Sequence, residues 1–249
     1  MRASTWDRRI SRAEQLACVS TTAADLLRFY VEITRFQKRV YDSLASVKRS
    51  DLNTALLDPH FAPLLSLVGR IGPQLLAEAA EELARRESAF EELLADPEPS
   101  GEIEIFFGRA LLQPYAENLA RRSNVAVGNS PPTCPFCGEK PQVGVLRQEG
   151  DGGKRSLICS LCSTEWDFRR LFCPSCGEEA VDKLPVYSAS EFEYVRLEAC
   201  DSCHTYIKSV DLTKNGLAVP VVDELASVPL NLWAEEHGYR KVQLNLLGM

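Results

Sequence analysis

The chain has 249 residues, with 45% hydrophobic and 25% charged side chains; these values exclude a disordered chain, a collagen-like chain and a coiled-coil rod. Its formal net charge is −7 and its isoelectric point is about 5.2, which argues against a nucleic-acid partner, because nucleic-acid-binding surfaces are usually basic. No apolar run approaches the ~18 residues of a membrane span, and the N-terminal residues lack the apolar core of a secretion signal. We therefore expect no membrane partner and a cytoplasmic, reducing environment.

The first 123 residues are rich in Ala, Leu, Glu and Arg and predict a helical bundle. Within residues 23–44, apolar side chains recur every three or four positions, as on one face of an amphipathic helix. These side chains are Leu26, Phe29, Ile33, Phe36, Val40 and Leu44. Thr21 or Thr22 is the expected N-cap of this helix, because a hydroxyl can accept the free N–H groups of the first turn.

Further helices are expected over residues 74–94 and 102–122. The prolines predict where helices start or bend, because proline cannot donate a backbone hydrogen bond. They predict a break at Asp58-Pro59, starts at Pro63 and Gly72-Pro73, and a new segment or a kink at Pro114. Cys18 lies within another helical pattern, and we expect it to be a buried structural thiol.

Residues 124–133 are typical of a linker by composition, and Pro131-Pro132 extends the chain at its end. Short β-like runs follow, and a Gly-rich stretch over residues 149–154 predicts a hairpin turn between the first two. The expected strands cover residues 143–147, 155–158, 183–187, 194–197 and 206–210. A last helical segment is expected from about residue 223 to residue 236, packed back on one of the other parts of the chain.

Eight of the nine cysteines form four Cys-x-x-Cys pairs between residues 134 and 203. The first two pairs enclose 21 residues and the last two enclose 23, close to the spacing of four-cysteine metal sites. Two residues between cysteines let both sulfurs face one ion, and a second such turn completes a tetrahedron. We therefore predict two metal sites, one formed by Cys134, Cys137, Cys159 and Cys162 and one by Cys173, Cys176, Cys200 and Cys203. An interleaved combination of the four pairs is the alternative.

Two of the pairs share the sequence Cys-Pro-x-Cys-Gly. Gly138 and Gly177 can adopt the left-handed backbone that lets N–H groups point at sulfur, and Pro135 and Pro174 stiffen the turns. Four-sulfur sites bind zinc or iron, the latter as in rubredoxin. Such a site has no open coordination position, so metal-dependent hydrolysis is not expected, and the ions could simply hold two small β modules together.

Other chemistries are weaker alternatives. The Cys-x-x-Cys pairs could be redox-active dithiols, but such motifs usually open a helix that follows a strand. His204 could replace a cysteine ligand, whereas His60 and His237 show no partner pattern. Nucleotide-binding and hydrolase motifs are missing from the sequence, so we do not expect an enzyme and propose no catalytic residue.

These features predict an α+β multidomain fold, with an N-terminal all-α helical domain, two tandem rubredoxin-like or zinc-ribbon β modules and a C-terminal helix. We expect a helical bundle over residues 1–123 and a linker over 124–133. The two four-cysteine modules are expected over residues 134–170 and 171–222, and the C-terminal helical segment over 223–249.

The segment that joins the two metal sites carries a further motif. It reads CSLCSTEWDFRRLFCPSCG from Cys159 onward, with Glu165, Trp166 and Arg169 between the cysteine pairs. A generic zinc ribbon does not need this aromatic and basic segment. The motif resembles that of the FdhE family, the formate dehydrogenase accessory proteins, and residues 26–40 and 221–241 resemble the helical segments at the two ends of that family.

The resemblance implies a cytoplasmic chaperone for the maturation of a respiratory formate dehydrogenase, which binds the catalytic subunit before export. It also implies rubredoxin-like centres that bind iron at the eight cysteines of the four pairs. Trp166 would pack between the modules and Arg169 would pair with Glu165 or with thiolate charge; the three residues are either structural or contact the client. The alternatives are a rubredoxin-like electron carrier, since iron–thiolate sites are redox-active, and a zinc-ribbon nucleic-acid-binding protein, which the acidic balance disfavours. The oligomeric state is not predicted.

Overall fold

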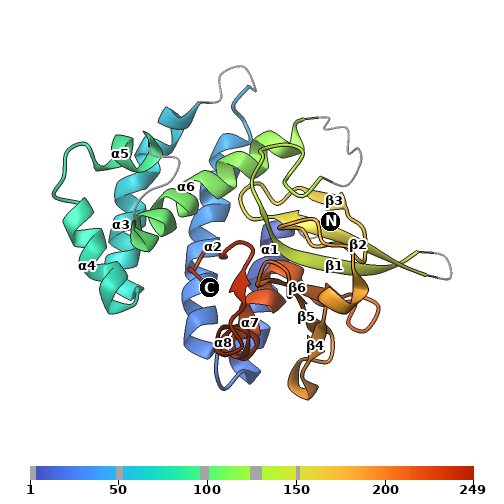
Figure 1. Cartoon of the computed structure of the whole chain (residues 1–249). Helices are drawn as coiled ribbons and strands as arrows, with labels where there is room; N and C mark the ends of the chain where they lie inside the picture. The colour runs from blue at the N-terminus through green and yellow to red at the C-terminus, as the bar shows by residue number, and fades with distance from the viewer. Residues whose placement is uncertain (1–3, 49–52, 96–100, 124–130, 150–151) are drawn as a thin grey trace.

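The computed structural model describes residues 4–48, 53–95, 101–123, 131–149 and 152–249. Its N-terminal part is helical and its C-terminal part contains one sheet (Figure 1), which confirms the predicted fold class. Most of the expected linker lies outside the described residues. Among the helices of the described part, none is both long and apolar enough to cross a membrane.

The helical part is built around one long amphipathic helix. Its helices are α1 Thr5–Val19, α2 Ala24–Leu44, α3 Asp58–Ile71, α4 Gln74–Leu83, α5 Ala89–Ala95 and α6 Glu102–Arg121, with a 3-10 turn at Thr54–Leu57. Helix α2 buries Ile33, Phe36, Val40 and Leu44 as expected, whereas Leu26 is only half-buried and Leu27 is fully buried in its place. The predicted helix over residues 23–44 is thus confirmed.

Two details of the helical prediction are wrong, and one of two alternatives is excluded for a third. The N-cap of α2 is Ala23, whose N–H donates to the Ser20 hydroxyl at 2.9 Å, so neither predicted threonine caps the helix. Pro63 lies inside α3 and does not start a helix. Pro114 lies inside the single helix α6, which excludes a new segment and leaves the predicted kink as the alternative.

The single helix expected over residues 74–94 is two helices, α4 and α5. A straight helix would carry Leu93 about 15 Å beyond Leu83 along its axis. The turn between them instead buries both leucines in one core and places the Phe90 ring 5.7 Å from the Phe61 ring of α3. Packing of the second half against the core therefore overrides the helical periodicity.

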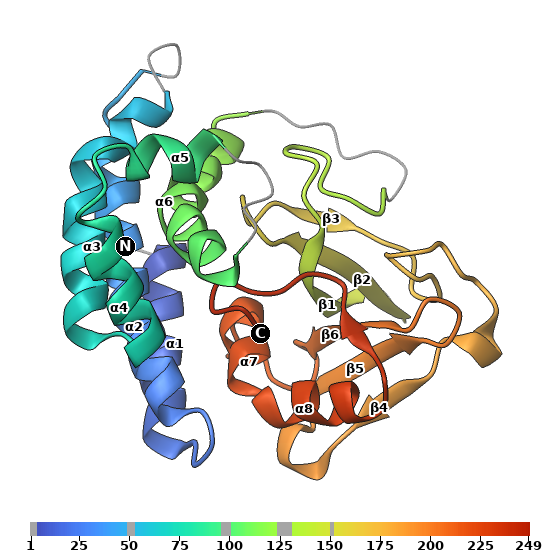
Figure 2. The same cartoon turned by 60° about the vertical axis from the view of Figure 1, so that its left-hand side comes forward.

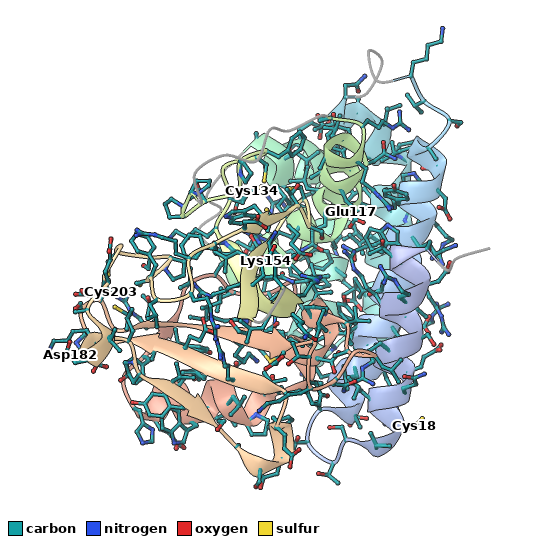
Figure 3. All side chains as sticks on the ribbon, turned by 90° about the vertical axis from the view of Figure 1, so that its right-hand side faces the viewer. Cys18, Glu117, Cys134, Lys154, Asp182 and Cys203 are labelled. Carbon is teal, nitrogen blue, oxygen red and sulfur yellow. The ribbon has the colours of Figure 1, made fainter. Side chains whose placement is uncertain are left out.

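Cys18 is exposed, so the expectation of a buried structural thiol is wrong. Helix α1 buries Ala13 and Ala17, and each further residue turns by about 100° around the helix axis. The position directly after Ala17 therefore points away from the core. Figure 3 shows Cys18 at the end of α1, far from the labelled cysteines of both clusters.

The C-terminal part forms a seven-stranded sheet in the order β3-β2-β1-β6-β5-β4, with β7 paired to β6. The strands are β1 Pro141–Glu149, β2 Gly152–Cys159, β3 Glu165–Asp167, β4 Val186–Ser188, β5 Val195–Cys200, β6 Thr205–Asp211 and β7 Arg240–Lys241. Strands β1 and β6 are parallel, with Val143 opposite Lys208, and this pairing joins the two cysteine-rich repeats into one sheet.

Most expected strands are present, with shifted ends. The strand expected at residues 183–187 is shorter and later, at Val186–Ser188, because a 3-10 turn occupies Val181–Lys183. Strands β3 and β7 were not predicted, and β7 lies in the C-terminal segment that was expected to be helical. Strands β1 and β2 do form a hairpin, with Glu149 opposite Gly152; residues 150–151 of its turn lie outside the described residues.

The expected C-terminal helix is also two helices, α7 Pro220–Ala226 and α8 Val228–Glu236. Helix α7 contacts α1, β1 and β6 and lies between the helices and the sheet (Figure 2). Its Val222 and Leu225 belong to the helical core, while Leu230 and Ala234 of α8 belong to the core of the sheet. The segment thus packs against both parts of the chain.

Two adjacent buried carboxylates of α7 are paired with cations from elsewhere in the chain. Asp223 accepts from Arg12 of α1 at 2.5 Å and from the Tyr194 hydroxyl at 2.8 Å. Glu224 pairs with Lys208 of β6 at 2.9 Å and with Lys241 of β7 at 2.5 Å. Figure 2 shows how these elements surround α7. Each charge is therefore compensated by another segment.

Burial and charge pairing also shift the pKa values of Glu224 and Lys208. Burial alone raises the pKa of Glu224, but the attraction of Lys208 and Lys241 outweighs it and lowers this pKa from 4.5 to about 2. Burial lowers the pKa of Lys208 to about 8, and the attraction of Glu224 offsets only part of this effect. For Glu224, the neighbouring charges outweigh the effect of burial, whereas for Lys208 they do not.

Replacing Glu224 by Gln is expected to lower the free energy of unfolding by ~3–5 kcal/mol, because two lysines then stay buried without a countercharge. Chemical denaturation of both proteins measures this difference. Glu81→Gln is the control, because the exposed pair Glu81–Arg85 contributes only ~0–1 kcal/mol. Equal losses in the two variants would contradict the role given to Glu224.

The same carboxylate predicts a pH dependence. Its folded-state pKa lies below its unfolded value, so its contribution is complete above about pH 4.5 and is lost as the pH falls toward about 2. The free energy of unfolding is expected to fall by ~3 kcal/mol as Glu224 becomes protonated. Unfolding free energies measured across this range should fall more steeply in the wild type than in Glu224→Gln. Parallel curves would show that Glu224 titrates normally.

Candidate metal centres

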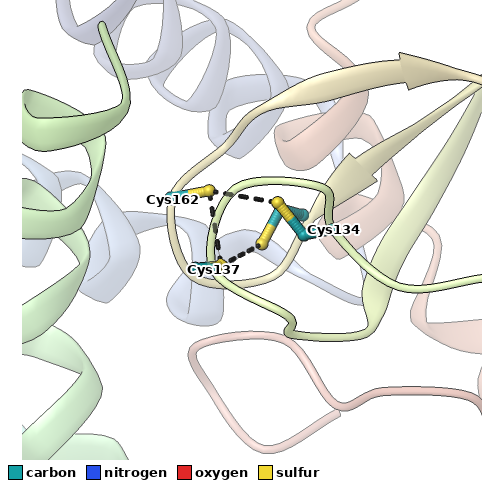
Figure 4. Close-up of side chains that lie close together, drawn as sticks. Cys134, Cys137 and Cys162 are labelled. Carbon is teal, nitrogen blue, oxygen red and sulfur yellow. Dashed lines mark hydrogen bonds between the residues drawn. The ribbon is translucent and has the colours of Figure 1, made fainter. Parts of the chain in front are cut away.

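The first centre is formed by Cys134, Cys137, Cys159 and Cys162. The first two precede β1, Cys159 ends β2 and Cys162 lies in the turn that follows (Figure 4). The sulfur–sulfur distances are 3.5 Å from Cys134 to Cys162, 3.4 Å from Cys137 to Cys159 and 3.5 Å from Cys137 to Cys162. A tetrahedral ion with ~2.3 Å bonds to sulfur requires sulfurs about 3.8 Å apart, so the cluster fits such an ion after a small expansion.

The second centre repeats this arrangement with Cys173, Cys176, Cys200 and Cys203. Its sulfur–sulfur distances are 3.7 Å from Cys173 to Cys203 and 3.7 Å from Cys176 to Cys200. In each centre all four sulfurs lie within 4.8 Å of one another. The structure therefore combines the first pair with the second and the third with the fourth, and not in the interleaved order.

The turns at the cysteines direct backbone N–H groups at sulfur. The N–H groups of Phe136, Leu161 and Ser175 each lie 3.4 Å from the sulfur of the cysteine two positions earlier. The residue directly after the second cysteine of every pair has a left-handed backbone. Its φ is 80° at Gly138 and Gly177, 56° at Ser163 and 54° at His204.

Ser163 and His204 were missed as turn residues, although both hold the position that glycine holds in the other two pairs. His204 is exposed and is not one of the four residues of the second centre. Its left-handed backbone, which histidine adopts more readily than most residues, accounts for its place beside Cys203.

Two threonine hydroxyls complete the sulfur surroundings and were also missed. Thr164 lies 3.1 Å from the sulfur of Cys162 and Thr205 lies 3.1 Å from the sulfur of Cys203. A hydroxyl at this position can donate to a metal-bound thiolate and reduce its charge density. The repeated pattern Cys-x-Thr after each site is the sequence signal that could have revealed them.

The close sulfurs also shift one another's ionisation. Hydrogen bonding from Cys137 lowers the pKa of the Cys134 thiol, whereas the bond to Cys134 raises the pKa of Cys159. At the second centre, burial opposes ionisation of Cys203, but the Thr205 hydroxyl and neighbouring thiols lower its pKa to about 7. Four thiolates at these distances need a cation between them, and binding of that cation releases the remaining protons.

The two centres have different surroundings. Knuckles of the first centre, meaning its Cys-x-x-Cys turns with the two residues that follow, contact the helical part. Arg9 of α1 donates to the Ser163 hydroxyl at 3.0 Å, Gln113 of α6 donates to the Ser160 carbonyl at 2.9 Å, and Arg109 pairs with Glu139 at 3.2 Å. The second centre lies farther out, and its Cys176 is exposed (Figure 3).

The motif between the centres has a structural arrangement that the sequence did not predict in full. Trp166 is 1% exposed and packs with the first-centre cysteines and with Ile207 of β6, and its indole donates to the Pro131 carbonyl at 2.9 Å. Glu165 pairs with Arg147. The expected pair between Arg169 and Glu165 is therefore absent.

Arg169 instead pairs with Glu179 at 3.0 Å, and its guanidinium lies 3.8 Å above the Phe172 ring. Arg155 has the connecting role that the sequence did not reveal. It is buried, pairs with Glu198 of β5 at 2.6 Å and donates to the Arg169 carbonyl at 2.9 Å. One side chain thus links the strands of both repeats and the segment between them.

Comparisons with known proteins agree with this arrangement. The chain matches the model of the FdhE central domain over residues 133–170 and that of the FdhE C-terminal domain over residues 172–247. A protein FdhE homolog from Aquifex aeolicus is 33% identical over 223 residues, which are 85% of this chain and 77% of the relative. One from Haemophilus influenzae is 34% identical over 131 residues, 52% of this chain and 43% of the relative.

A solved structure is similar over the whole chain. The crystal structure of the FdhE protein from Pseudomonas aeruginosa aligns with a TM-score of 0.75 and 27% identity, covering 99% of this chain and 97% of that one. The resemblance inferred from the cysteine-rich motif is thereby confirmed.

We expect two metal ions per chain and independent loss of each. Cys159→Ser should leave about one ion, held by the second centre, and Cys200→Ser should leave about one, held by the first, because a tetrahedral site with three thiolates binds far more weakly. His204→Gly should keep both ions, since glycine suits the left-handed backbone. Elemental analysis of the purified variants measures this. A missing ion in His204→Gly would make that histidine a ligand.

Proposed function

The chain belongs to the FdhE family of formate dehydrogenase accessory proteins, and from this premise we propose that it binds the catalytic subunit of a respiratory formate dehydrogenase. We place this binding in the cytoplasm, before the subunit is exported. The observation that carries the proposal is the match to an FdhE homolog over 85% of the chain, together with a complete set of eight cysteines in two clusters.

The proposed role is that of a maturation factor rather than of an enzyme that turns over a substrate. Each cluster supplies four sulfurs to one ion, and a four-coordinate thiolate site keeps no position for a substrate or a water nucleophile. The centres would act by shaping the surface that meets the client. Both centres belong to one shared sheet, since β1 and β6 pair directly.

We propose that each cluster holds one tetrahedral ion, iron of the rubredoxin type or zinc. Both metals suit four sulfurs, because thiolates are soft ligands. Bound iron would supply one-electron redox chemistry and bound zinc would supply structure alone. The chain contributes the N–H groups and threonine hydroxyls that lie within hydrogen-bonding distance of the sulfurs.

A rubredoxin-like electron carrier is the second candidate, and one observation favours it. Cys176 of the second centre is exposed, so an iron ion there would lie close to the surface. A visible iron–thiolate absorption that bleaches reversibly, in a protein that does not bind the catalytic subunit, would support the carrier and contradict the accessory role.

We expect the tagged chain, purified without oxygen, to capture the formate dehydrogenase catalytic subunit. The double variant Cys173→Ser/Cys176→Ser should capture at least about tenfold less, because losing the metal unfolds the surrounding turns. Cys18→Ser is the matched control: this cysteine is exposed and outside both clusters, so capture should be unchanged.

Two results would contradict these expectations separately. A wild-type chain that carries two ions and captures no catalytic subunit would overturn the proposed function. A double variant that has lost one ion yet captures and activates the subunit normally would leave the function standing and remove the second centre from it.

A further inference from the structure

We propose that the two centres have different roles: the first is a closed structural centre that fastens the helices to the sheet, and the second is an open centre that exchanges a ligand with small anionic thiols. The exchanging ligand is Cys176. This inference rests on the proposed binding of one ion in each cluster and goes beyond the accessory function, which does not distinguish between the two centres.

The first centre is enclosed. Three of its cysteines are 1–3% exposed, and its cluster includes Ala116 of α6. The guanidinium of Arg9 links Glu117 of α6, at 2.9 Å, to the Ser163 hydroxyl beside Cys162, at 3.0 Å. An incoming ligand would have to displace these contacts between the helices and the knuckles, so the enclosed ion should exchange slowly.

The second centre is open on one side. Exposed Cys176 lies in a surface hollow of about 610 Å³, which Pro131, Pro132, Arg169, Phe172, Ser175 and Gly177 also line. On the inner side, Cys173 and Cys200 line a cavity of about 140 Å³. The turns of the second centre are held by hydrogen bonds within the sheet region. Ser202 donates to Glu178 at 2.6 Å, and Tyr239 donates to Asp201 at 2.6 Å. Access to sulfur is therefore possible without moving the helices.

The hollow also has a cation, Arg169, that favours an anionic ligand. Four thiolates around a divalent ion carry a net negative charge, which repels anions. The guanidinium of Arg169 lies over Phe172 at the same hollow, and its pair with Glu179 is exposed and therefore weak. This cation can turn toward the carboxylate of a small anionic thiol while the thiol sulfur approaches Cys176.

The exchange is balanced without an oxidant or a reductant. The incoming thiol loses its proton as its sulfur takes the place of Cys176, and the released sulfur of Cys176 takes up that proton. One metal–sulfur bond forms and one breaks, and no electron changes hands. Cys173, Cys200 and Cys203 keep their positions, which holds the ion during the exchange.

The test uses the full chain loaded with two zinc ions, a coloured zinc chelator and glutathione as the anionic thiol. We expect one zinc per chain to leave at least about tenfold faster than the other, because exposure governs how readily a thiolate reacts. Besides the exposed Cys18, iodoacetamide added after the fast phase should label the cysteines of the second centre before those of the first, with Cys176 first within that centre. Release of both ions at one rate, or earlier labelling of the first centre, would overturn the inference.

The role of Arg169 is tested by comparing the rate of the fast phase with a charged and with a neutral thiol. Arg169→Gln should slow the fast phase about threefold or more with glutathione and leave it unchanged with neutral 2-mercaptoethanol, because only the anion gains from the positive charge. Arg147→Gln is the matched control, since Arg147 is also part-exposed and paired with a glutamate. Equal slowing with both thiols would overturn the preference for anions.

These outcomes are separable from the proposed function. A chain that never holds two ions would overturn the metal-binding proposal itself. A chain that holds two ions, captures the catalytic subunit and releases the ions at one rate would overturn only the difference between the centres.

Discussion

The pairing of two adjacent buried carboxylates on α7 is the constraint on which the arrangement of the whole chain depends. Burying a carboxylate without a countercharge costs several kcal/mol, so Asp223 and Glu224 restrict where α7 can lie. Asp223 requires Arg12 of α1, and Glu224 requires Lys208 of β6 and Lys241 of β7. Only a position between the helices and the sheet satisfies both, and Figure 2 shows α7 in that position.

The metal centres depend on this arrangement to different degrees. The first centre lies where α1 and α6 meet the sheet, so its surroundings are complete only when the helices are packed against the sheet. The second centre is completed by the sheet alone, through the strands β5 and β6 and the segment that Arg155 holds. The repeat in the sequence therefore produces two chemically similar clusters in physically different environments, one enclosed and one open, and this difference is what a client or a small thiol would meet.

The cysteine clusters could be predicted from the sequence because their geometry is local. Each pair lies within one tight turn, and the left-handed residue after it is a glycine in two of the four cases. The rest of the site was not predictable in this way. Arg169 was expected to pair with Glu165 or with thiolate charge and instead pairs with Glu179, while Glu165 in β3 pairs with Arg147 of β1. Arg155 gave no signal at all, since its partner Glu198 is 43 positions away in the sequence.

The sequence by itself determined the helical first half, most of the strands, the eight sulfurs and the family, since each rests on residue type and spacing within a short stretch. Only the tertiary structure decided how these parts meet. It divided the helix expected at residues 74–94 into two and placed Cys18 on the surface. It also joined the two cysteine repeats through parallel strands and packed the helices against the first centre rather than the second. The physical reason is that burial and charge pairing depend on residues far apart in the chain, and their partners are established only when the chain has folded.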